Sequence, residues 1–528
     1  MRKGTKVGLL WSAAVAGAML AALVGAGWYL SGQLEPFVRE RTVAFLSQRF
    51  DGDVALERFK ISMPVRDPVK VLLNRGRGAR VKVKASGILL RQRGARESYP
   101  LLKLRGLTFD VDVSKLFESP AVIDSVHIDG MELALPPKGE RRFGSSQLKR
   151  GSGKDVNVLI GRIVVDGMKL VILPRDRAKA PLEFDLHKLT LESAGAGVAM
   201  KYFTSMKNAK PPGVIDCSGT FGPYVTEEPG ETPLTGDYVF RGADLAVFKG
   251  IAGTLSSTGR FGGSLNEIVV EGETTVPDFR LPAAGNPMKL TTQFHAIVDG
   301  TNGNTRLEPV KARLGTSPIL CSGSVVRYPD ENGKTVDLDC TVKNGRLDEF
   351  LRLAVKGNRP PMTGHIDFDV RIIVPPERMP YAEKLQVAGP FKLREGLFTN
   401  PKVQEQLDDM SRRAQGRPSD MSLTGATSNF EGRMVLKRQL LTIDGLVFRM
   451  EGAMVRLSGQ YDLKADTVEF HGQVRTEARL SQMMKTPWKR IALKPVDPIF
   501  AKDGAGAQFD VAITGPAGSP SFGLEKKK

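Results

Sequence analysis

The side chains that most often perform chemistry in proteins are scattered along this sequence. Each of its five histidines stands alone in a β-type run, without a metal-ligand partner at short spacing: His127, His187, His295, His365 and His471. The chain contains no G-x-S-x-G, no P-loop and no H-E-x-x-H motif. The pattern favours structural or surface histidines, and it predicts a protein without a catalytic centre, a metal or a cofactor.

Three cysteines, Cys217, Cys321 and Cys340, lie in separate strand-like runs. Their odd number and wide spacing give neither a disulfide framework nor a C-x-x-C motif. We interpret them as small buried side chains. A single bridge in an oxidising compartment remains an alternative that the sequence leaves open.

The N-terminus carries an apolar segment, residues 7–30, without a charge. Its 24 residues would span about 36 Å as a helix, and a bilayer core is about 30 Å thick. Arg2, Lys3 and Lys6 precede it, which predicts a cytoplasmic N-terminus. We expect an uncleaved single-pass anchor with an exported body. The alternative is a cleaved signal peptide, whose apolar region is usually shorter.

The chain is basic, with a formal net charge of +18, and half of this excess follows the apolar segment. Residues 33–110 contain 17 Lys or Arg and 8 Asp or Glu, a net +9. An exported location disfavours nucleic acid, so we expect attraction to anionic lipid headgroups or a merely solvated basic face. The candidate membrane-surface residues are Arg75, Arg77, Arg80, Lys82, Lys84, Arg91 and Arg93.

The dominant hydrophobic period of the body is two, which is typical of strands with one apolar and one polar face. Ile366, Phe368, Val370 and Ile372 alternate with His365, Asp367, Asp369 and Arg371. A second candidate hairpin places Val455, Leu457, Val468 and Phe470 on one face. Helical signals are few, and the strongest covers residues 400–416, where Val403, Leu407 and Met410 form an apolar stripe. A short amphipathic helix is also expected within residues 33–50.

One short motif occurs twice, as "VHIDGMELALP" (126–136) and "IVVDGMKLVILP" (163–174). Each copy reads as strand, tight turn or bulge, then strand, an element that buries its apolar face only by stacking on neighbours. Together with the N-terminal anchor, three further stretches complete a pattern: "FLSQRFDGDVALERFKIS", "LFTNPKVQEQLDDMSRRAQG" and "LTIDGLVFRMEGAMVRLSGQYDL". In the order of these loose motifs, over most of its length, the chain resembles the AsmA family of bacterial envelope proteins.

The resemblance implies a mostly β protein: an N-terminal transmembrane helix, then an elongated, curled antiparallel sheet that forms a groove, with short amphipathic helices. The expected regions are a cytoplasmic stub (1–6), the anchor (7–30), an N-terminal β region (31–224), a central β region (225–375) and a C-terminal β region (376–528). The residues expected to line the groove are Ile366, Phe368, Val370, Ile372, Val455, Leu457, Val468 and Phe470.

The function implied is non-enzymatic: an inner-membrane protein with a periplasmic body that binds or transfers membrane phospholipid in outer-membrane biogenesis or homeostasis. Membrane phospholipid is the expected partner, and other envelope proteins are further candidates. A second hypothesis is a structural or regulatory factor that affects outer-membrane protein assembly without carrying lipid. A third is an anchored enzyme acting on an envelope polymer, because the sequence does not show which carboxylates face each other.

Overall fold

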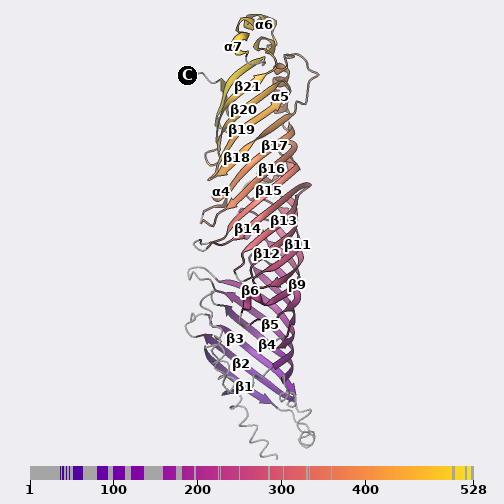
Figure 1. Cartoon of the computed structure of the whole chain (residues 1–528), viewed down its shortest axis with the longest axis vertical. Coiled ribbons are helices and arrows are strands. Elements are labelled where there is room, and N and C mark those ends of the chain that lie inside the picture. The colour runs from indigo at the N-terminus through magenta and orange to yellow at the C-terminus, as the bar shows by residue number, and fades with distance from the viewer. Residues whose placement is uncertain are drawn as a thin grey trace, which may run out of the picture. The chain divides into compact units, whose positions relative to one another are not determined.

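A computed structural model gives the fold of the chain (Figure 1). It describes residues 36, 39–40, 43, 47, 52–62, 80–92, 99–112, 121–135, 158–173, 181–195, 198–223, 225 and 228–524, apart from 249, 283–285, 301, 329–330, 332, 358, 378, 502–505 and 518–519. The expected anchor and most of the helix expected within residues 33–50 lie outside this description; the residues described there, 36, 39, 40, 43 and 47, are helical. No helix among the described residues has the length and apolar character needed to cross a bilayer.

The described residues are mostly β, and almost every strand pairing among them is antiparallel. The chain divides into two compact units, which are described separately below. Unit 1 consists of Met1–Ala209 and the later segment Val214–Glu227. Unit 2 consists of Lys210–Gly213 and Glu228–Lys528. The three-part division of the body expected from the sequence stays a prediction.

The first eight strands are β1 Gly52–Ser62, β2 Arg80–Gln92, β3 Leu102–Asp112, β4 Ala121–Leu135, β5 Val158–Ile172, β6 Leu182–Gly195, β7 Met200–Ala209 and β8 Pro212–Phe221. Strands β1 to β7 each pair with the next. The pairing of β4 with β5 is parallel, which corrects the expectation of a purely antiparallel sheet. A parallel pair needs a crossover connection between its strands.

The two Asp-Gly-Met motifs lie side by side in these parallel strands, in register, with Asp129 opposite Asp166 and Met131 opposite Met168. Gly130 and Gly167 have φ of +66° and +72°, a conformation that glycine adopts without strain. Each glycine shifts the alternation by one residue, so that Ile128 and Met131 pack in the same cluster. The repeat is therefore a glycine irregularity that occurs at the same register in both strands, and pairing the two copies keeps the apolar side chains of both strands on one face.

Unit 2 is a succession of antiparallel strands: β9 Pro233–Asp244, β10 Thr254–Ser264, β11 Ile268–Phe279, β12 Met288–Val298, β13 Thr305–Leu314, β14 Ser317–Val326, β15 Thr335–Arg346, β16 Met362–Val374, β17 Gln386–Phe398, β18 Ser428–Lys437, β19 Leu440–Met450, β20 Ala453–Asp462, β21 Thr467–Thr476, β22 Ala507–Pro516 and β23 Ser521–Leu524. Each strand pairs with the next. The connections therefore alternate between two rims of the sheet.

The two rims differ in what they carry. The rim that begins after β9, here called the helix rim, carries α3 Leu347–Ala354, α5 Pro401–Ala414, α6 Pro487–Leu493 and α7 Asp497–Phe500, with the 3-10 turns η3 Leu245–Val247, η4 Leu480–Met483 and η5 Lys494–Val496. The opposite rim, here called the turn rim, carries short turns and the four-residue α4 Tyr381–Lys384. Before β9 lies η2 Pro229–Glu231.

Helix α5 forms where the sequence predicted it. The side chain of Asn400 accepts a hydrogen bond from the backbone N–H of Lys402 (3.0 Å), Pro401 occupies the first turn, and Gly416 follows the helix with φ +74°. The predicted apolar stripe is wrong in part, since Leu407 is buried while Val403 and Met410 are exposed. Only one face of this short helix meets the sheet, and the stripe is wider than that contact.

The expectation of a curled sheet is wrong, because the sheet is open. Within unit 2 the pairings run from β9 to β23 in chain order, and among the described residues none joins the two edge strands. Alternation of apolar and polar residues determines which face a side chain occupies. It does not specify curvature, which depends on the placement of bulges and on twist.

Candidate functional site

Strand register places one continuous set of side chains on a single face of unit 2, here called the apolar face. In antiparallel pairs, residues directly opposite each other share a face. Phe368 of β16 lies opposite Phe391 of β17 and Val342 of β15, and Phe470 of β21 lies opposite Ile513 of β22. The eight residues expected to line a groove all lie on this face: Ile366, Phe368, Val370 and Ile372 of β16, Val455 and Leu457 of β20, and Val468 and Phe470 of β21.

The apolar face is not an ordinary closed core, because its burial falls from the helix rim to the turn rim. Most fully buried side chains of unit 2 lie at or near the helix rim, including Ala243, Val276, Leu314, Val342, Leu393, Met450, Ala453 and Ala507. Towards the turn rim the side chains of the same face are only partly buried, including Leu338, Ile372, Leu436, Leu441, Val468 and Ile513. Of the eight predicted residues, Val370 is buried and the others are partly exposed.

Helix α5 covers only the end of this face. It packs Leu407 and Ala414 against Met450 and Ala453 at the β19–β20 connection, with Phe448 beside them. Phe470 is not part of that cluster. The helix therefore closes the helix rim and leaves the hairpin of β20 and β21 uncovered by this contact.

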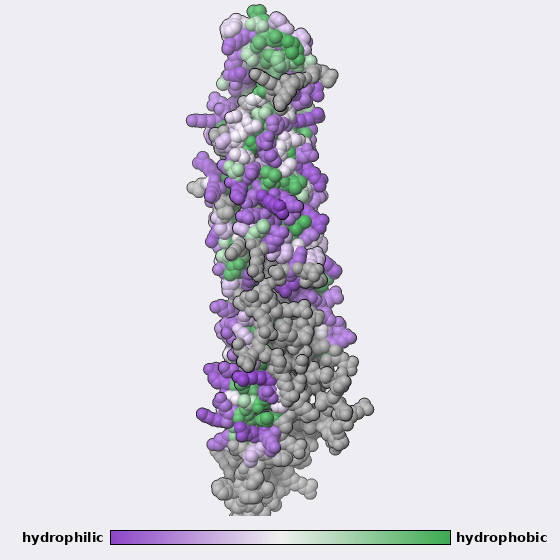
Figure 2. Space-filling view, turned by 90° about the vertical axis from the view of Figure 1, so that its left-hand side faces the viewer, coloured by the Kyte–Doolittle hydropathy of each residue, from purple (hydrophilic) through white to green (hydrophobic). Residues whose placement is uncertain are grey.

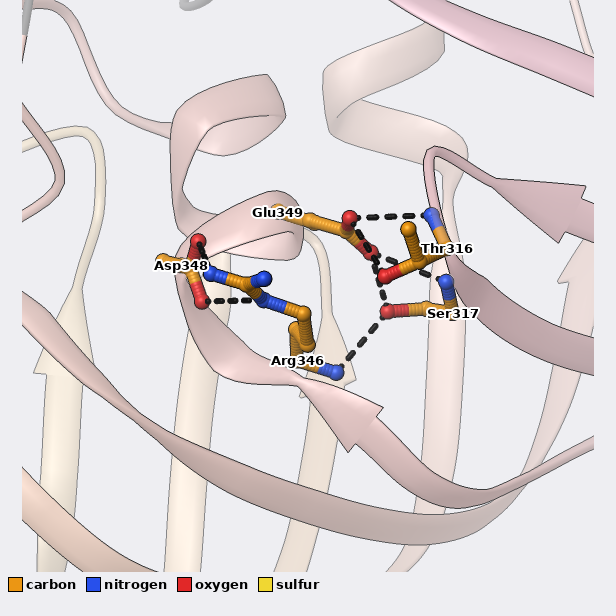
Figure 3. A network of polar contacts seen from close by, with 5 residues as sticks. All are labelled: Thr316, Ser317, Arg346, Asp348 and Glu349. Atoms are coloured by element: carbon orange, nitrogen blue, oxygen red, sulfur yellow. Dashed lines mark hydrogen bonds and ion pairs between the residues drawn. The ribbon is translucent and has the colours of Figure 1, made fainter.

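Buried carboxylates fix the helices to the rim. Figure 3 shows Glu349 of α3 pointing at the β13–β14 turn, where it accepts hydrogen bonds from the backbone N–H of Thr316 and of Ser317 (both 2.9 Å) and from both hydroxyls. The Ser317 hydroxyl in turn accepts from the backbone N–H of Arg346 (2.8 Å). Four donors converge on one buried carboxylate, so the contact ties α3 to the sheet.

The same device recurs twice along the rim. Asp408 of α5 accepts from the backbone N–H groups of Gly425 (3.1 Å) and Ala426 (2.9 Å) and from the Gln404 amide (2.9 Å). Asp497 of α7 accepts from the backbone N–H (2.8 Å) and hydroxyl (2.6 Å) of Ser481. Each carboxylate satisfies loop amides that burial would otherwise leave unpaired.

Two of these carboxyls have lowered pKa values. Burial raises the pKa of Glu349, but the hydrogen bonds from Ser317 and Thr316 outweigh it and hold the pKa below its usual value. At Asp408 burial likewise raises the pKa, and the hydrogen bonds from Gly425, Ala426 and Gln404 outweigh it. Both groups are therefore charged acceptors, which is the form that a structural contact to amides requires.

The opposite face of unit 2 is polar and carries cross-strand ion pairs. Arg371 donates hydrogen bonds to both carboxylate oxygens of Asp337 (2.8 and 2.6 Å). The Arg449 guanidinium lies 2.6 Å from a carboxylate oxygen of Glu431. A depression of about 890 Å³ opens on this face, with Lys311, Arg313 and Lys343 on its wall beside several threonines. Its lining is mixed in charge and rich in hydroxyls, which fits solvent better than acyl chains.

Four of the seven basic residues predicted for a membrane surface are described, and these four share one face of β2. Arg80, Lys84 and Arg91 are exposed and Lys82 is partly buried. Gly87, with φ +66°, shifts the alternation between them and keeps the buried Val81, Val83, Ile88 and Leu90 on the other face. The remaining three candidates, Arg75, Arg77 and Arg93, lie outside the described residues.

One disulfide joins Cys321 of β14 to Cys340 of β15, which lie directly opposite each other with their Cα atoms 4.2 Å apart. Sequence spacing did not predict this bridge, because it depends on the register of two strands. The hydroxyl of Tyr202 lies 3.5 Å from the sulfur of the third cysteine, Cys217.

Among the residues that the structure describes, no group of three or more His, Cys, Asp or Glu side chains could hold a metal ion. The chain matches no protein-family model, no curated protein and no solved structure at a significant level. The partly exposed apolar face is therefore the main candidate for a binding site in unit 2.

Proposed function

We propose that this chain is an envelope lipid-handling protein of the AsmA type, which binds or passes phospholipid acyl chains along the apolar face of unit 2. The observation that carries the proposal is the partial exposure of that face from β15 to β22. Apolar surface left in water costs roughly 25 cal/mol per Å². An extended apolar surface that the fold leaves accessible is typical of a site for an apolar partner.

The two rims suit this role. Helices and buried carboxylates close the helix rim, while the turn rim leaves the adjoining apolar side chains partly exposed. An acyl chain would lie across the partly exposed side chains, and its headgroup would stay in water beyond the turns. No carboxylate or histidine is needed for such binding.

The proposed location is the periplasm, with the body tethered to the inner membrane by residues 7–30. The disulfide between Cys321 and Cys340 supports an exported body, because such bridges persist in oxidising compartments. The uncharged N-terminal segment after Arg2, Lys3 and Lys6 supports the tether.

The proposal is tested by a charge on the apolar face of the β20–β21 hairpin. Full-length protein carrying Phe470→Asp should stay folded and co-purify with less phospholipid than the wild type, because an unpaired charge is strongly disfavoured beside acyl chains. His471→Asp, one residue away on the exposed polar face, is the matched control and should retain the lipid. Melting temperature and bound phospholipid are measured on the same samples.

Two outcomes oppose the proposal. A folded Phe470→Asp variant with unchanged lipid content removes this hairpin from the binding face. If Phe470→Asp unfolds the protein while Ile372→Asp and Val468→Asp do so as well, the face is ordinary core.

A further inference from the structure

The end of unit 2 formed by α6, η5 and α7 exposes large apolar side chains. Trp488 is 65% exposed, Ile491 70% and Ile499 71%. Trp488 and Ile491 are three residues apart in α6 and therefore lie on one side of that helix. Figure 2 shows hydrophobic surface gathered at the end of the molecule where Figure 1 labels α6 and α7. We call these three residues the cap patch.

The exposure is not that of a loose end, since the segment is held by contacts within itself, with α5 and with β22. Asp497 binds Ser481, and the Lys485 ammonium lies 2.7 Å from Asp409 of α5. The ring of Phe500 lies 5.2 Å from that of Phe509 in β22. The cap patch is therefore exposed by the fold, although burying its three apolar side chains would lower the free energy of the folded protein.

The segment that carries the cap patch is basic. Residues 479–501 contain five basic side chains and a single acidic one. The acidic residue, Asp497, is buried and already bound to Ser481. Lys489 and Lys494 are exposed beside the patch, and the Lys489 ammonium lies 5.5 Å from the centre of the Trp488 ring.

We propose that the cap patch is a docking surface for an anionic phospholipid bilayer, with Trp488, Ile491 and Ile499 entering the headgroup region and the surrounding lysines facing lipid phosphates. A tryptophan with aliphatic neighbours and a basic rim is the combination that favours the membrane interface. Each basic residue near such a surface strengthens binding by about fivefold. This surface is separate from the apolar face and does not depend on that face carrying lipid.

The test uses full-length protein held in nanodiscs and immobilised through a tag at its N-terminus. Fluorescent vesicles of phosphatidylethanolamine and phosphatidylglycerol in a three-to-one ratio are added, and their capture is compared with that of pure phosphatidylcholine vesicles. The wild type should capture the anionic vesicles preferentially. The triple variant Trp488→Ser, Ile491→Ser, Ile499→Ser should reduce this capture by about tenfold or more.

Matched controls separate the patch from general exposure. Tyr328→Ser, Met421→Ser and Leu524→Ser remove three exposed side chains elsewhere and should leave capture unchanged. Lys489→Glu with Lys494→Glu should weaken capture, whereas Lys437→Glu with Lys464→Glu, exposed residues at the opposite rim, should not. Phe470→Asp should leave capture intact, which distinguishes docking from acyl-chain binding.

Two results overturn the proposal. One is equal capture by the wild type and the cap-patch variant, with matching circular dichroism spectra. The other is capture of phosphatidylcholine vesicles as efficient as that of the anionic ones, which would remove the role of the basic rim.

Discussion

The two rims of unit 2 lie at opposite ends of the same strands, and the apolar face is more deeply buried at the helix rim than at the turn rim. At the helix rim, loops of up to about thirty residues fold back as helices, and buried carboxylates such as Glu349 and Asp408 accept their backbone amides. At the turn rim, connections such as Arg438–Gln439 are tight, and neighbouring apolar side chains stay partly exposed. Stability is therefore concentrated along one rim, which leaves the other available for a partner.

The difference between the two rims is tested most strongly by removing a comparable carboxylate from each. Asp408→Ala should lower the free energy of unfolding by about 3 kcal/mol, because it removes the acceptor of the buried Ala426 amide, of the partly buried Gly425 amide and of one Gln404 side-chain hydrogen bond. Asp462→Ala should cost less than about 1 kcal/mol. The Asp462 carboxylate also accepts two backbone amides, from Lys464 and Ala465, but in an exposed turn.

Both costs are measured by urea denaturation at neutral pH. Equal costs for the two variants would contradict the view that the rims differ in stability.

The next effect depends on pH at Glu349. Its pKa in the folded protein is lowered from 4.5, so its stabilising contribution is complete above pH 4.5 and is lost as the pH falls through the lower folded value. Glu349→Gln should cost about 2 kcal/mol at pH 7. That difference from the wild type should shrink as the pH falls below 4.5, in unfolding experiments from pH 7 to pH 3. A difference independent of pH would show that the charge of Glu349 is not what holds α3.

A smaller effect is expected at the start of α5. Asn400→Ala removes the N-cap bond to Lys402 and should lower stability by about 1 kcal/mol. Asn400→Ser should recover most of that loss, because a serine hydroxyl accepts the same bond. Thermal unfolding followed by circular dichroism measures both. A loss that serine fails to recover would point to packing of the asparagine instead of capping.

The smallest effect is expected on the polar face. Arg449→Gln breaks the ion pair with Glu431, but both side chains are more than a third exposed. Such pairs contribute about 0.5 kcal/mol or less. A cost near that of Asp408→Ala, in the same urea experiment, would mean that the polar face also carries structural stability.

Much of the strand content could be predicted from the sequence, because period two is a local signal. The alternation around Ile366 and Phe368, the hairpin at Val455–Phe470 and the capped helix after Asn400 all follow from neighbours in the chain. Features that depend on which segments meet in space could not be predicted. The parallel pairing of the two Asp-Gly-Met motifs and the bridge between Cys321 and Cys340 depend on register.

The helix rim shows the same limit for the candidate site. The run "GRLDEFLRLA" predicts a helix, and α3 forms there. Nothing in that run shows that Glu349, and not Asp348 beside it, reaches the β13–β14 turn. That choice depends on how α3 lies against a hairpin whose Ser317 stands 32 residues earlier in the chain. The curvature of the sheet was mispredicted for a related reason, since the hydrophobic pattern specifies faces and not bending.

The central claim, that phospholipid acyl chains lie on the apolar face, is tested most directly by photo-crosslinking along β16. A photoreactive residue is placed in turn at Ile366, Asp367, Phe368, Asp369, Arg371 and Ile372 of the full-length protein in cells, and the attached phospholipid is detected by mass spectrometry. The account predicts lipid adducts at Ile366, Phe368 and Ile372, and none at Asp367, Asp369 or Arg371. Adducts at every position alike, or at none, would contradict it.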